Sequence, residues 1–271
     1  MLLPLLLLLT PSTITSVSFC DQENWNIVWS DDFDTLDLKN TWTIDLGGND
    51  SKVRDSQGTV ENVYIQNISK TNSVLVLRSQ RQQSKNYNYT SGAINSQNKQ
   101  FWKGPARVCV NAMLPGRPFS SNSNGVWPAH WLMPNTKACW PSNGEIDIME
   151  MINGDGVLHG TYHWSPNCSN CNCTNLQLGG QTKITGDWNA TWHEYAVEYT
   201  NDWIAFVLDS KVYSNITRGM KHKGVPAAFY DVPYYLILNT AVGGPWPKPV
   251  DASTTFPLYH YIDYVHVSKP K

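Results

Sequence analysis

Charged residues are scarce in this sequence, and the two signs nearly balance. Lys and Arg number 20 and Asp and Glu number 22, together 15% of the 271 residues, which leaves a formal net charge of −2. No basic patch or stripe occurs along the chain, so it lacks the electrostatic footprint of a nucleic-acid-binding protein. We therefore expect no nucleic acid among its partners.

Long apolar runs are missing beyond the N-terminus, so no later segment could cross a bilayer as a helix. The opening MLLPLLLLLTPSTITSVSF holds a leucine run too short to span, followed by small residues. This pattern is typical of a secretory signal peptide, although the usual positive residue before the run is absent. We predict a signal peptide over 1–18, with a membrane anchor as the weaker alternative, and a single domain over 19–271. We expect the mature protein to be secreted, or to lie in the lumen of the secretory or lysosomal pathway, without membrane contact.

Sequons for N-linked glycosylation agree with export, because these glycans are added in the secretory pathway. We therefore predict a glycoprotein. The seven sequons begin at Asn49, Asn67, Asn88, Asn167, Asn172, Asn189 and Asn215.

The cysteines lack the partners that a zinc site needs. Three of the six fall in the stretch NCSNCNC, and no His-x3–5-His or second CxxC pair completes a zinc knuckle. In an oxidising compartment, disulfides are the better prediction, and the sequence leaves their pairing open. The six are Cys20, Cys109, Cys139, Cys168, Cys171 and Cys173.

Extended amphipathic helices are also absent. Short runs rich in β-branched and aromatic residues recur between turn signals instead, which predicts an all-β sandwich or jelly roll. Asn201-Asp202 suits a hairpin turn between the runs at 193–200 and 203–209. The longest polar insertions, 115–126 and 165–192, are expected to be loops. The predicted strands lie at 26–33, 73–81, 104–114, 145–152, 193–200, 203–209, 234–242 and 261–268.

Aromatic residues, by contrast, are plentiful, with 12 Trp and 13 Tyr. Many of these rings should fill the core. Flat indole rings also stack on the apolar faces of sugars, so a carbohydrate-binding cleft is the second interpretation.

The stretch GEIDIMEMI places three carboxylates among apolar residues. In a strand, Glu145 and Asp147 share one face, but Glu150 falls on the other, because five positions is an odd step. One extra residue at Ile148 or Met149, accommodated as a β-bulge, would bring the third acid back beside the other two. Acids clustered on one face repel one another, a cost that a function would explain.

Such a row of acids suits the hydrolysis of a glycosidic bond. A retaining glycosidase needs two carboxyl groups roughly 5–5.5 Å apart, one ionised as nucleophile and one protonated as acid. A third carboxyl beside the nucleophile can orient it and help to separate the protonation states of the outer two. The alternatives are a solvated acidic edge strand and a calcium site, which the intervening apolar residues and the nearby tryptophans disfavour.

These residues resemble glycoside hydrolase family 16, and specifically its laminarinase-like endo-β-1,3-glucanases. GEIDIME matches the bulged E-[IL]-D-[IL]-[ML]-E signature of that family, and GVWPAHWLMP resembles its WPAFW segment. The departures are His130, where the family often has Phe, and the NCSNCNC insertion. Similar segments follow the family order along nearly the whole mature chain: WSDDFDTLDLKNTW, YTSGAINSQ, HEYAVEYTNDWIAFVLDSKVY, YLILNTAVGGPWP and FPLYHYIDYVHV.

The resemblance implies a β-jelly-roll sandwich of two antiparallel sheets with a substrate cleft across the concave one. It implies Glu145 as the nucleophile, Glu150 as the general acid and then base, and Asp147 as an assisting carboxylate. It implies no cofactor in the chemistry. At Asp263 it suggests a structural calcium ion on the convex side, with a turn or surface acid as the alternative. It further implies a set of substrate-binding residues, namely Trp127, Trp131, Trp140, Trp246, His163, Asn62 and Asn239.

We therefore predict a secreted, monomeric, retaining endo-glycosidase that hydrolyses laminarin-like β-1,3-glucan, with activity on mixed-linkage β-1,3(4)-glucan left open. One rival is a non-catalytic β-glucan-recognition protein, which typically loses one or both of the glutamates that this chain keeps. A second is a relative that acts on β-galactan. A third is a disulfide- or zinc-centred interaction module, which only the cysteine cluster supports.

Overall fold

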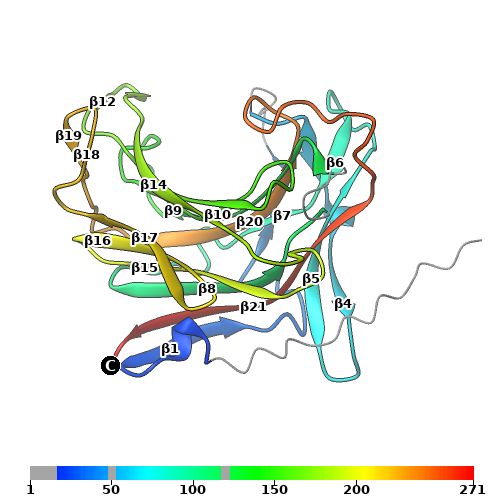
Figure 1. Cartoon of the computed structure of the whole chain (residues 1–271), viewed down its shortest axis with the longest axis horizontal. Coiled ribbons are helices and arrows are strands. Elements are labelled where there is room, and N and C mark those ends of the chain that lie inside the picture. Colours follow the sequence, from blue (N-terminus) through cyan, green and yellow to red (C-terminus); the bar gives the residue numbers. More distant parts are fainter. Residues whose placement is uncertain (1–16, 48–52, 117–122) are drawn as a thin grey trace, which may run out of the picture.

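Two packed β-sheets make up most of the molecule, and one of them curves so that its concave face opens upward in Figure 1. The computed structural model describes residues 17–47, 53–116 and 123–271. The predicted all-β jelly-roll sandwich is confirmed. The predicted signal peptide lies outside the described residues except for its last two positions, and so do the sequon at Asn49 and the middle of the loop expected at 115–126.

The concave sheet has seven strands in the order β14-β11-β10-β9-β20-β7-β2, and its neighbours run antiparallel. Its central strands are apolar on the side that faces the second sheet and carry most of the polar residues on the open side. The seven are β2 (Thr43–Ile44), β7 (Ala93–Asn95), β9 (Val126–Pro134), β10 (Glu145–Glu150), β11 (Val157–Trp164), β14 (Leu176–Lys183) and β20 (Tyr234–Val242).

The convex sheet has ten strands, and only the short β3–β6 pair within it is parallel. Its main path is β17-β16-β15-β8-β21-β5-β6-β3, with β1 paired to β21 and β4 paired to β5. The ten are β1 (Trp25–Asp31), β3 (Ser56–Gly58), β4 (Val63–Asn67), β5 (Ser73–Gln80), β6 (Tyr89–Ser91), β8 (Ala106–Met113), β15 (His193–Tyr199), β16 (Trp203–Leu208), β17 (Lys211–Thr217) and β21 (Leu258–Pro270).

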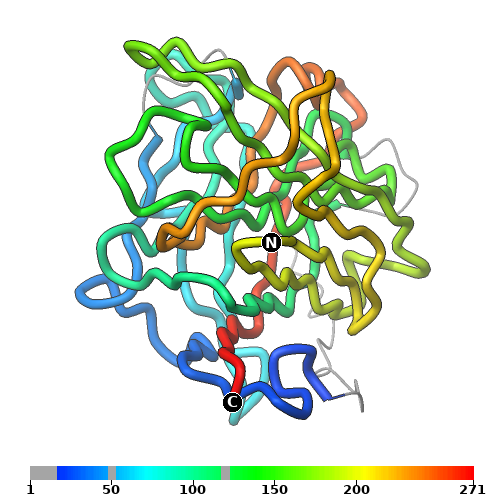
Figure 2. The backbone as a smooth tube through the Cα atoms, turned by 90° about the vertical axis from the view of Figure 1, so that its left-hand side faces the viewer, coloured from blue at the N-terminus to red at the C-terminus, as the bar shows by residue number. Residues whose placement is uncertain are grey.

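Short elements complete the described chain. Because β1 pairs with β21, the segment that follows the predicted signal peptide lies beside the C-terminus, at the lower end of Figure 2. No helix among the described residues is long and apolar enough to cross a membrane. The remaining elements are the 3-10 helices η1 (Phe19–Asp21) and η2 (Val60–Asn62), and the two-stranded pairs β12 (Cys168–Ser169) with β13 (Asn172–Cys173) and β18 (Lys221–His222) with β19 (Val225–Pro226).

The core fills the space between the two sheets and takes many of the aromatic rings. Trp42, Trp164 and Trp188 are fully buried there together with aliphatic side chains from both sheets. Burying one such large side chain contributes on the order of 2–3 kcal/mol. The interpretation of the aromatic residues as core side chains is therefore correct for part of them, whereas others lie on the concave face.

The hairpin predicted around Asn201-Asp202 is confirmed, because β15 and β16 pair antiparallel across that turn. The loop expected over 165–192 is only partly a loop. Residues 176–183 form β14, which pairs along its whole length with β11 and extends the concave sheet. Gly179 and Gly180 weaken the sequence signal for a strand, yet here they let two neighbouring strands approach closely, since a Cβ on Gly179 would lie 2.3 Å from the carbonyl oxygen of Gly160.

All six cysteines are paired in disulfides, as predicted over a zinc site. Cys20–Cys109 ties the N-terminal 3-10 helix to β8. The other two, Cys139–Cys171 and Cys168–Cys173, close the β12–β13 hairpin and fasten it to the loop that leads into β10. The cluster that suggested an interaction module is thus a brace beside the concave face.

Candidate active site

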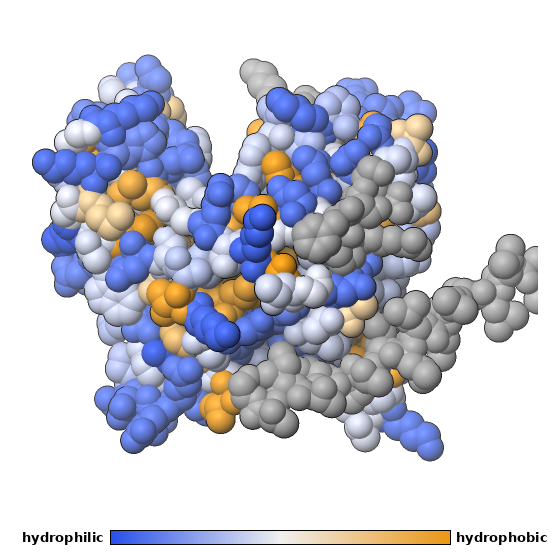
Figure 3. Space-filling model, in the orientation of Figure 1, coloured by the Kyte–Doolittle hydropathy of each residue, from blue (hydrophilic) through white to orange (hydrophobic). Residues whose placement is uncertain are grey.

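A cleft of about 870 Å³ crosses the concave sheet. Figure 3 shows the molecule hollowed there between two raised rims. Side chains at alternate positions of neighbouring strands line its floor, as the two-residue period of a strand requires. They are Trp127, Ala129, Trp131 and Met133 from β9, Glu145, Asp147 and Glu150 from β10, His159, Thr161 and His163 from β11, Gln177 and Gln181 from β14, and Asn239 and Ala241 from β20, with Val53, Arg54, Trp140 and Trp246 at the sides.

The three acids of β10 share this face because the strand is bulged. Against β9, Asp147 pairs with Trp131 and Met149 pairs with His130, so the residue between them has no partner. Against β11, the register likewise shifts between Asp147 and Glu150. The predicted bulge at Ile148 or Met149 is confirmed, and both of these side chains are buried in the core while the acids point into the cleft.

A glycine controls how the chain enters this strand. Gly144 has φ +85°, a backbone conformation that side-chain-bearing residues rarely adopt. A Cβ there would lie 2.7 Å from the Tyr234 hydroxyl and 2.9 Å from the Tyr162 hydroxyl. The turn therefore requires glycine, and it sets the position of Glu145 directly after it.

Each outer glutamate accepts a hydrogen bond from an indole. Trp140 Nε1 donates to Glu145 Oε2 at 2.8 Å, and Trp127 Nε1 donates to Glu150 Oε1 at 3.0 Å. Trp140 follows Cys139, so the Cys139–Cys171 disulfide braces the loop that carries the first of these donors. Both bonds limit the rotamers of the carboxyl groups.

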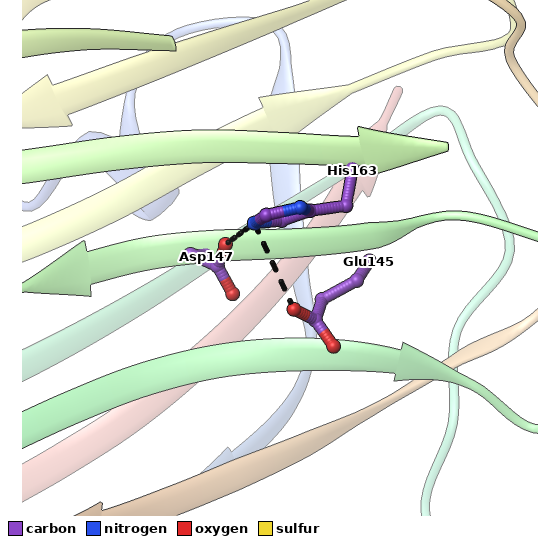
Figure 4. Close-up of side chains that lie close together, drawn as sticks. All are labelled: Glu145, Asp147 and His163. Carbon is purple, nitrogen blue, oxygen red and sulfur yellow. Dashed lines mark ion pairs between the residues drawn. The ribbon is translucent and has the colours of Figure 1, made fainter. Parts of the chain in front are cut away.

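His163 lies between the first two acids of the strand (Figure 4). Its Nε2 is 3.2 Å from Asp147 Oδ2 and 4.0 Å from Glu145 Oε1, while its Nδ1 is 3.0 Å from Asn175 Oδ1. An Asn oxygen only accepts, so Nδ1 carries a proton and donates it there. Nε2 is then the ring nitrogen that faces the two acids.

Burial raises the pKa of all three acids. The pKa of Glu145 rises to about 8, first through desolvation and then through the charge of Asp147, while His163 and Trp140 oppose the rise. Desolvation also raises the pKa of Asp147 to about 8. The pKa of Glu150 is raised well above its usual range by desolvation and by the charges of both other acids, against the opposing effects of His163 and Trp127. Protons are therefore retained in this row near neutral pH.

We predict that Asp147→Asn stabilises the protein at neutral pH. A carboxyl whose folded-state pKa is raised contributes most stability below its unfolded pKa, near 4, and loses that contribution as the pH rises toward about 8. Asparagine keeps the shape and does not titrate, so we expect a gain of about 1–3 kcal/mol at pH 7 and none at pH 3.5. Calorimetric unfolding of both proteins at the two pH values measures it, and an equal change at both values would contradict the origin in ionisation.

Three of the cleft side chains could also hold a metal ion. Glu145, Asp147 and His163 each offer one ligand atom, and these atoms lie within 4.8 Å of one another. The same three side chains form the close row described above, so the geometry accommodates either proton exchange or a cation. Proton transfer between paired carboxyls at the centre of a long open cleft suits the cleavage of a polymer.

Comparison with known proteins assigns the chain to a family. The family model described as glycosyl hydrolases family 16 matches residues 57–264. The chain belongs to that family. It is accordingly a glycoside hydrolase, and the predicted resemblance is confirmed.

Individual members of family 16 are similar over almost the full chain. A β-glucanase from Rhodothermus marinus is 31% identical over 258 residues, which cover 90% of this chain and 85% of that protein. The crystal structure of the laminarinase catalytic domain from Thermotoga maritima superposes with a TM-score of 0.77 and 29% identity, over 92% of this chain and all of that one. A keratan-sulfate endo-1,4-β-galactosidase from Sphingobacterium multivorum is 30% identical, over 94% of this chain and 57% of that protein.

The cleft contains most of the site residues that were predicted from the sequence. All four tryptophans line it, with Trp246 edge-on to Trp127 at a centroid distance of 5.1 Å. Trp131 Nε1 donates to Asn239 Oδ1 at 2.7 Å, so these two side chains fix one another on the floor. Their contacts with sugar stay a prediction.

Two nominated residues lie elsewhere. Asn62 is fully buried in η2, where its Oδ1 accepts a hydrogen bond from Arg78 Nε at 2.9 Å, and it is not among the residues that line the cleft. The expectation that it faces the substrate is corrected: its amide instead fixes the neighbouring strand. Asp263 lies on β21 of the convex sheet and accepts from Asn72 Nδ2 at 3.1 Å. Among the described residues it joins no group of three metal-binding side chains, and the calcium ion stays a prediction.

Several cleft residues were not nominated from the sequence. His159 and Thr161 lie on the same face of β11 as His163, and Gln181 Nε2 contacts His159 Nδ1 at 3.2 Å from the adjacent β14. The signal for the first two was present, because VLHGTYHW alternates polar residues with Leu158, Tyr162 and Trp164 in the core. Gln177 and Gln181 carried no such signal, since their segment was expected to be a loop.

Proposed function

We propose that this protein is a retaining endo-β-1,3-glucan hydrolase in which Glu145 is the nucleophile, Glu150 the acid and base, and Asp147 an assisting carboxyl. The observation that carries the proposal is the bulged strand, which aims all three acids into an open cleft. The raised pKa of Glu150 supports its role, because the general acid must hold a proton.

In the first step, the Glu150 carboxyl gives its proton to the glycosidic oxygen, and the bond from that oxygen to the anomeric carbon breaks. A carboxylate oxygen of Glu145 attacks the same carbon from the opposite face and forms a glycosyl ester. A hydrogen bond from Trp140 and the nearby His163 ring favour the ionised form of Glu145 that this attack needs. Asp147 assists as the neighbouring carboxyl, with its Oδ2 at 3.2 Å from His163 Nε2.

In the second step, Glu150 is a carboxylate and takes a proton from water. The resulting hydroxide bonds to the anomeric carbon, and the ester bond to Glu145 breaks. Two inversions at one carbon retain the β configuration. The reaction draws on protein carboxyl groups and water, so the proposal requires no cofactor.

A polymer of β-linked glucose fits this cleft and these relatives. Four tryptophans along the cleft offer flat apolar faces for pyranose rings, and amide and imidazole groups from β11, β14 and β20 offer hydrogen bonds to hydroxyls. The β-glucanase named above suggests β-glucan as the substrate class, and the laminarinase suggests laminarin, a β-1,3-glucan, within it. The galactosidase relative makes β-galactan the second candidate.

We also propose that the protein is exported and glycosylated, as its leader-like N-terminus and sequons predict. Of the sequon asparagines in the described residues, Asn67, Asn88, Asn167, Asn172 and Asn215 are exposed and Asn189 is partly exposed. None of these asparagines is among the residues that line the cleft, so glycans at these positions are compatible with substrate entry.

The deciding experiment digests laminarin, barley mixed-linkage β-glucan, β-1,3-galactan and cellulose with the purified protein. We expect oligosaccharides of several lengths from laminarin from the earliest time points, because a long open cleft admits internal bonds. Proton NMR during the digestion should show the β anomer appearing first, before mutarotation. Initial accumulation of the α anomer would contradict retention. Faster release of oligosaccharides from galactan than from laminarin would make β-galactan the substrate class. Binding to laminarin without any product would favour the recognition-protein rival.

A further inference from the structure

A buried carboxylate on the convex sheet lacks a cationic partner. Glu194, on β15, is only 5% exposed. Within residues 17–47, 53–116 and 123–271 it accepts three hydrogen bonds and forms no ion pair. The guanidinium of Arg107, which contacts Phe19, is already paired with Glu198 at 2.7 Å. An uncompensated buried charge is costly, so a missing cation is expected here.

The backbone nitrogen of Phe19 lies at the place where such a cation is needed. Phe19 N donates to Glu194 Oε1 at 2.8 Å, Ser18 Oγ to Oε2 at 2.5 Å and Tyr264 Oη to Oε2 at 2.8 Å. As a peptide N–H, the nitrogen supplies one neutral donor. As an α-ammonium group at the start of a chain, it would supply a full positive charge and three donors.

The sequence predicts a cleavage site at the peptide bond between Ser18 and Phe19. Ser16 and Ser18 are small residues at the third and first positions before Phe19, which is the small-x-small pattern of signal-peptide cleavage sites. Cleavage acts on the emerging chain before the fold forms, so burial of Phe19 in the finished protein does not oppose it. The preceding Val17 is 61% exposed, and Ser18 is the leader residue that contacts the fold, through Glu194, Cys20 N and Asp21 N.

The fold holds the rest of the first residues independently of any leader. The Phe19 ring packs against the Arg107 guanidinium with 3.8 Å from Cζ to the ring centroid, and Arg107 Nη1 donates to the Phe19 carbonyl oxygen at 2.6 Å. The next residue, Cys20, is fully buried and bonded to Cys109. Phe19 is thereby fixed on both sides, and its nitrogen is held against Glu194.

We propose that Phe19 is the first residue of the mature protein and that its α-ammonium group forms a buried ion pair with Glu194. Removal of the leader then creates the positive charge that pairs with Glu194 on the convex sheet. The unprocessed chain is the less stable form. The inference concerns maturation and is independent of the proposed glucanase activity, which its test does not measure.

The first test expresses the full sequence in eukaryotic cells that secrete it, and determines the N-terminus by Edman sequencing and intact mass. We expect Phe19 as the first residue. A chain that begins at any other residue, or that keeps the leader, would overturn the proposal.

The second test measures the ion pair in two proteins released from a fusion by a protease that leaves no extra residue. One starts at Phe19, and the other at Val17, which keeps the Ser18 contact and moves the ammonium group two residues away. At pH 6 we expect the Phe19 form to unfold about 2–4 °C higher. Glu194→Gln should abolish that difference, whereas Glu61→Gln, which changes an exposed acid on η2, should preserve it. Equal melting temperatures of the two starts, or a difference that survives Glu194→Gln, would refute the pairing.

The pH dependence gives a readout that needs no variant. A paired α-amino group has its pKa raised above the usual value near 8, so the advantage of the Phe19 form should persist below that pH and vanish as the pH rises through the raised pKa. The groups that face it are Glu194 and, around it, Tyr264, His266, Arg107 and Glu198, and burial raises the pKa of Tyr264 so that it stays a neutral donor. Acetylation of the α-amine at pH 7 should be several-fold slower from Phe19 than from Val17. Equal rates would count against the proposal.

Discussion

Glu145→Gln should lower kcat on laminarin by at least about 10⁴-fold, because the amide oxygen cannot form the glycosyl ester. Glutamine keeps the size of the side chain and can still accept the hydrogen bond from Trp140. It also removes a carboxyl whose pKa is raised by burial, so the variant should fold at least as well as the parent. The expected loss is therefore chemical and not structural.

The measurement compares reducing-sugar release by the parent, by Glu145→Gln and by a matched control, Glu61→Gln, which changes an exposed glutamate outside the cleft. The control should retain the parent rate. Unfolding temperatures of all three proteins separate a loss of activity from a loss of fold. A Glu145→Gln protein with more than about one hundredth of the parent rate would remove this residue from the role of nucleophile.

A second variant tests the face of attack. Glu145→Ala leaves room for a small anion beneath the anomeric carbon, and azide can then replace the carboxylate. With an aryl β-laminaribioside that carries a good leaving group, azide should restore turnover and yield the α-glycosyl azide, with one inversion in place of two. A β-azide product would place the missing nucleophile on the other face of the sugar.

Much of this site could be predicted from the sequence because it depends on local periodicity. The odd spacing between Asp147 and Glu150 predicts a bulge, and β10 has it, because only the bulged register lets Ile148 and Met149 both enter the core while the acids face the cleft. The alternation around Trp127 and Trp131 on β9 places both rings on the same face for the same reason. Local pattern was sufficient wherever one strand face meets the core.

The features that the sequence did not predict depend on contacts between distant segments. The Cys139–Cys171 pairing joins two loops that local patterns do not connect, and Asn62 is buried where Arg78, from β5, binds it. Residues 176–183 have glycines where a strand former is expected, and only the close approach of Gly160 on β11 explains them. These features follow from tertiary packing, which overrides local propensity.

Glu150→Gln should have an effect that depends on the leaving group. On laminarin, whose leaving sugar needs a proton, we expect kcat/KM to fall about 10²–10⁴-fold. On a 2,4-dinitrophenyl β-laminaribioside, whose leaving group departs unprotonated, the first step should persist and the glycosyl ester should accumulate, because no base remains to activate water. A burst of dinitrophenol followed by slow turnover, and an ester adduct on Glu145 in the mass spectrum, would report this state.

Azide and pH complete the assignment of Glu150. Azide needs no base, so it should release the accumulated ester as the β-glycosyl azide, the opposite anomer from that expected with Glu145→Ala. In the parent, kcat/KM on laminarin should fall at alkaline pH as Glu150 loses its proton, and this limb should lie far above the usual pKa of a glutamate because burial and the two neighbouring acids raise its pKa. Glu150→Gln should lose that limb, because the residual rate no longer depends on this proton. An unchanged alkaline limb in the variant would assign the acid to another of the clustered carboxyls, and the equal loss of activity on both substrates would deny that Glu150 protonates the leaving oxygen.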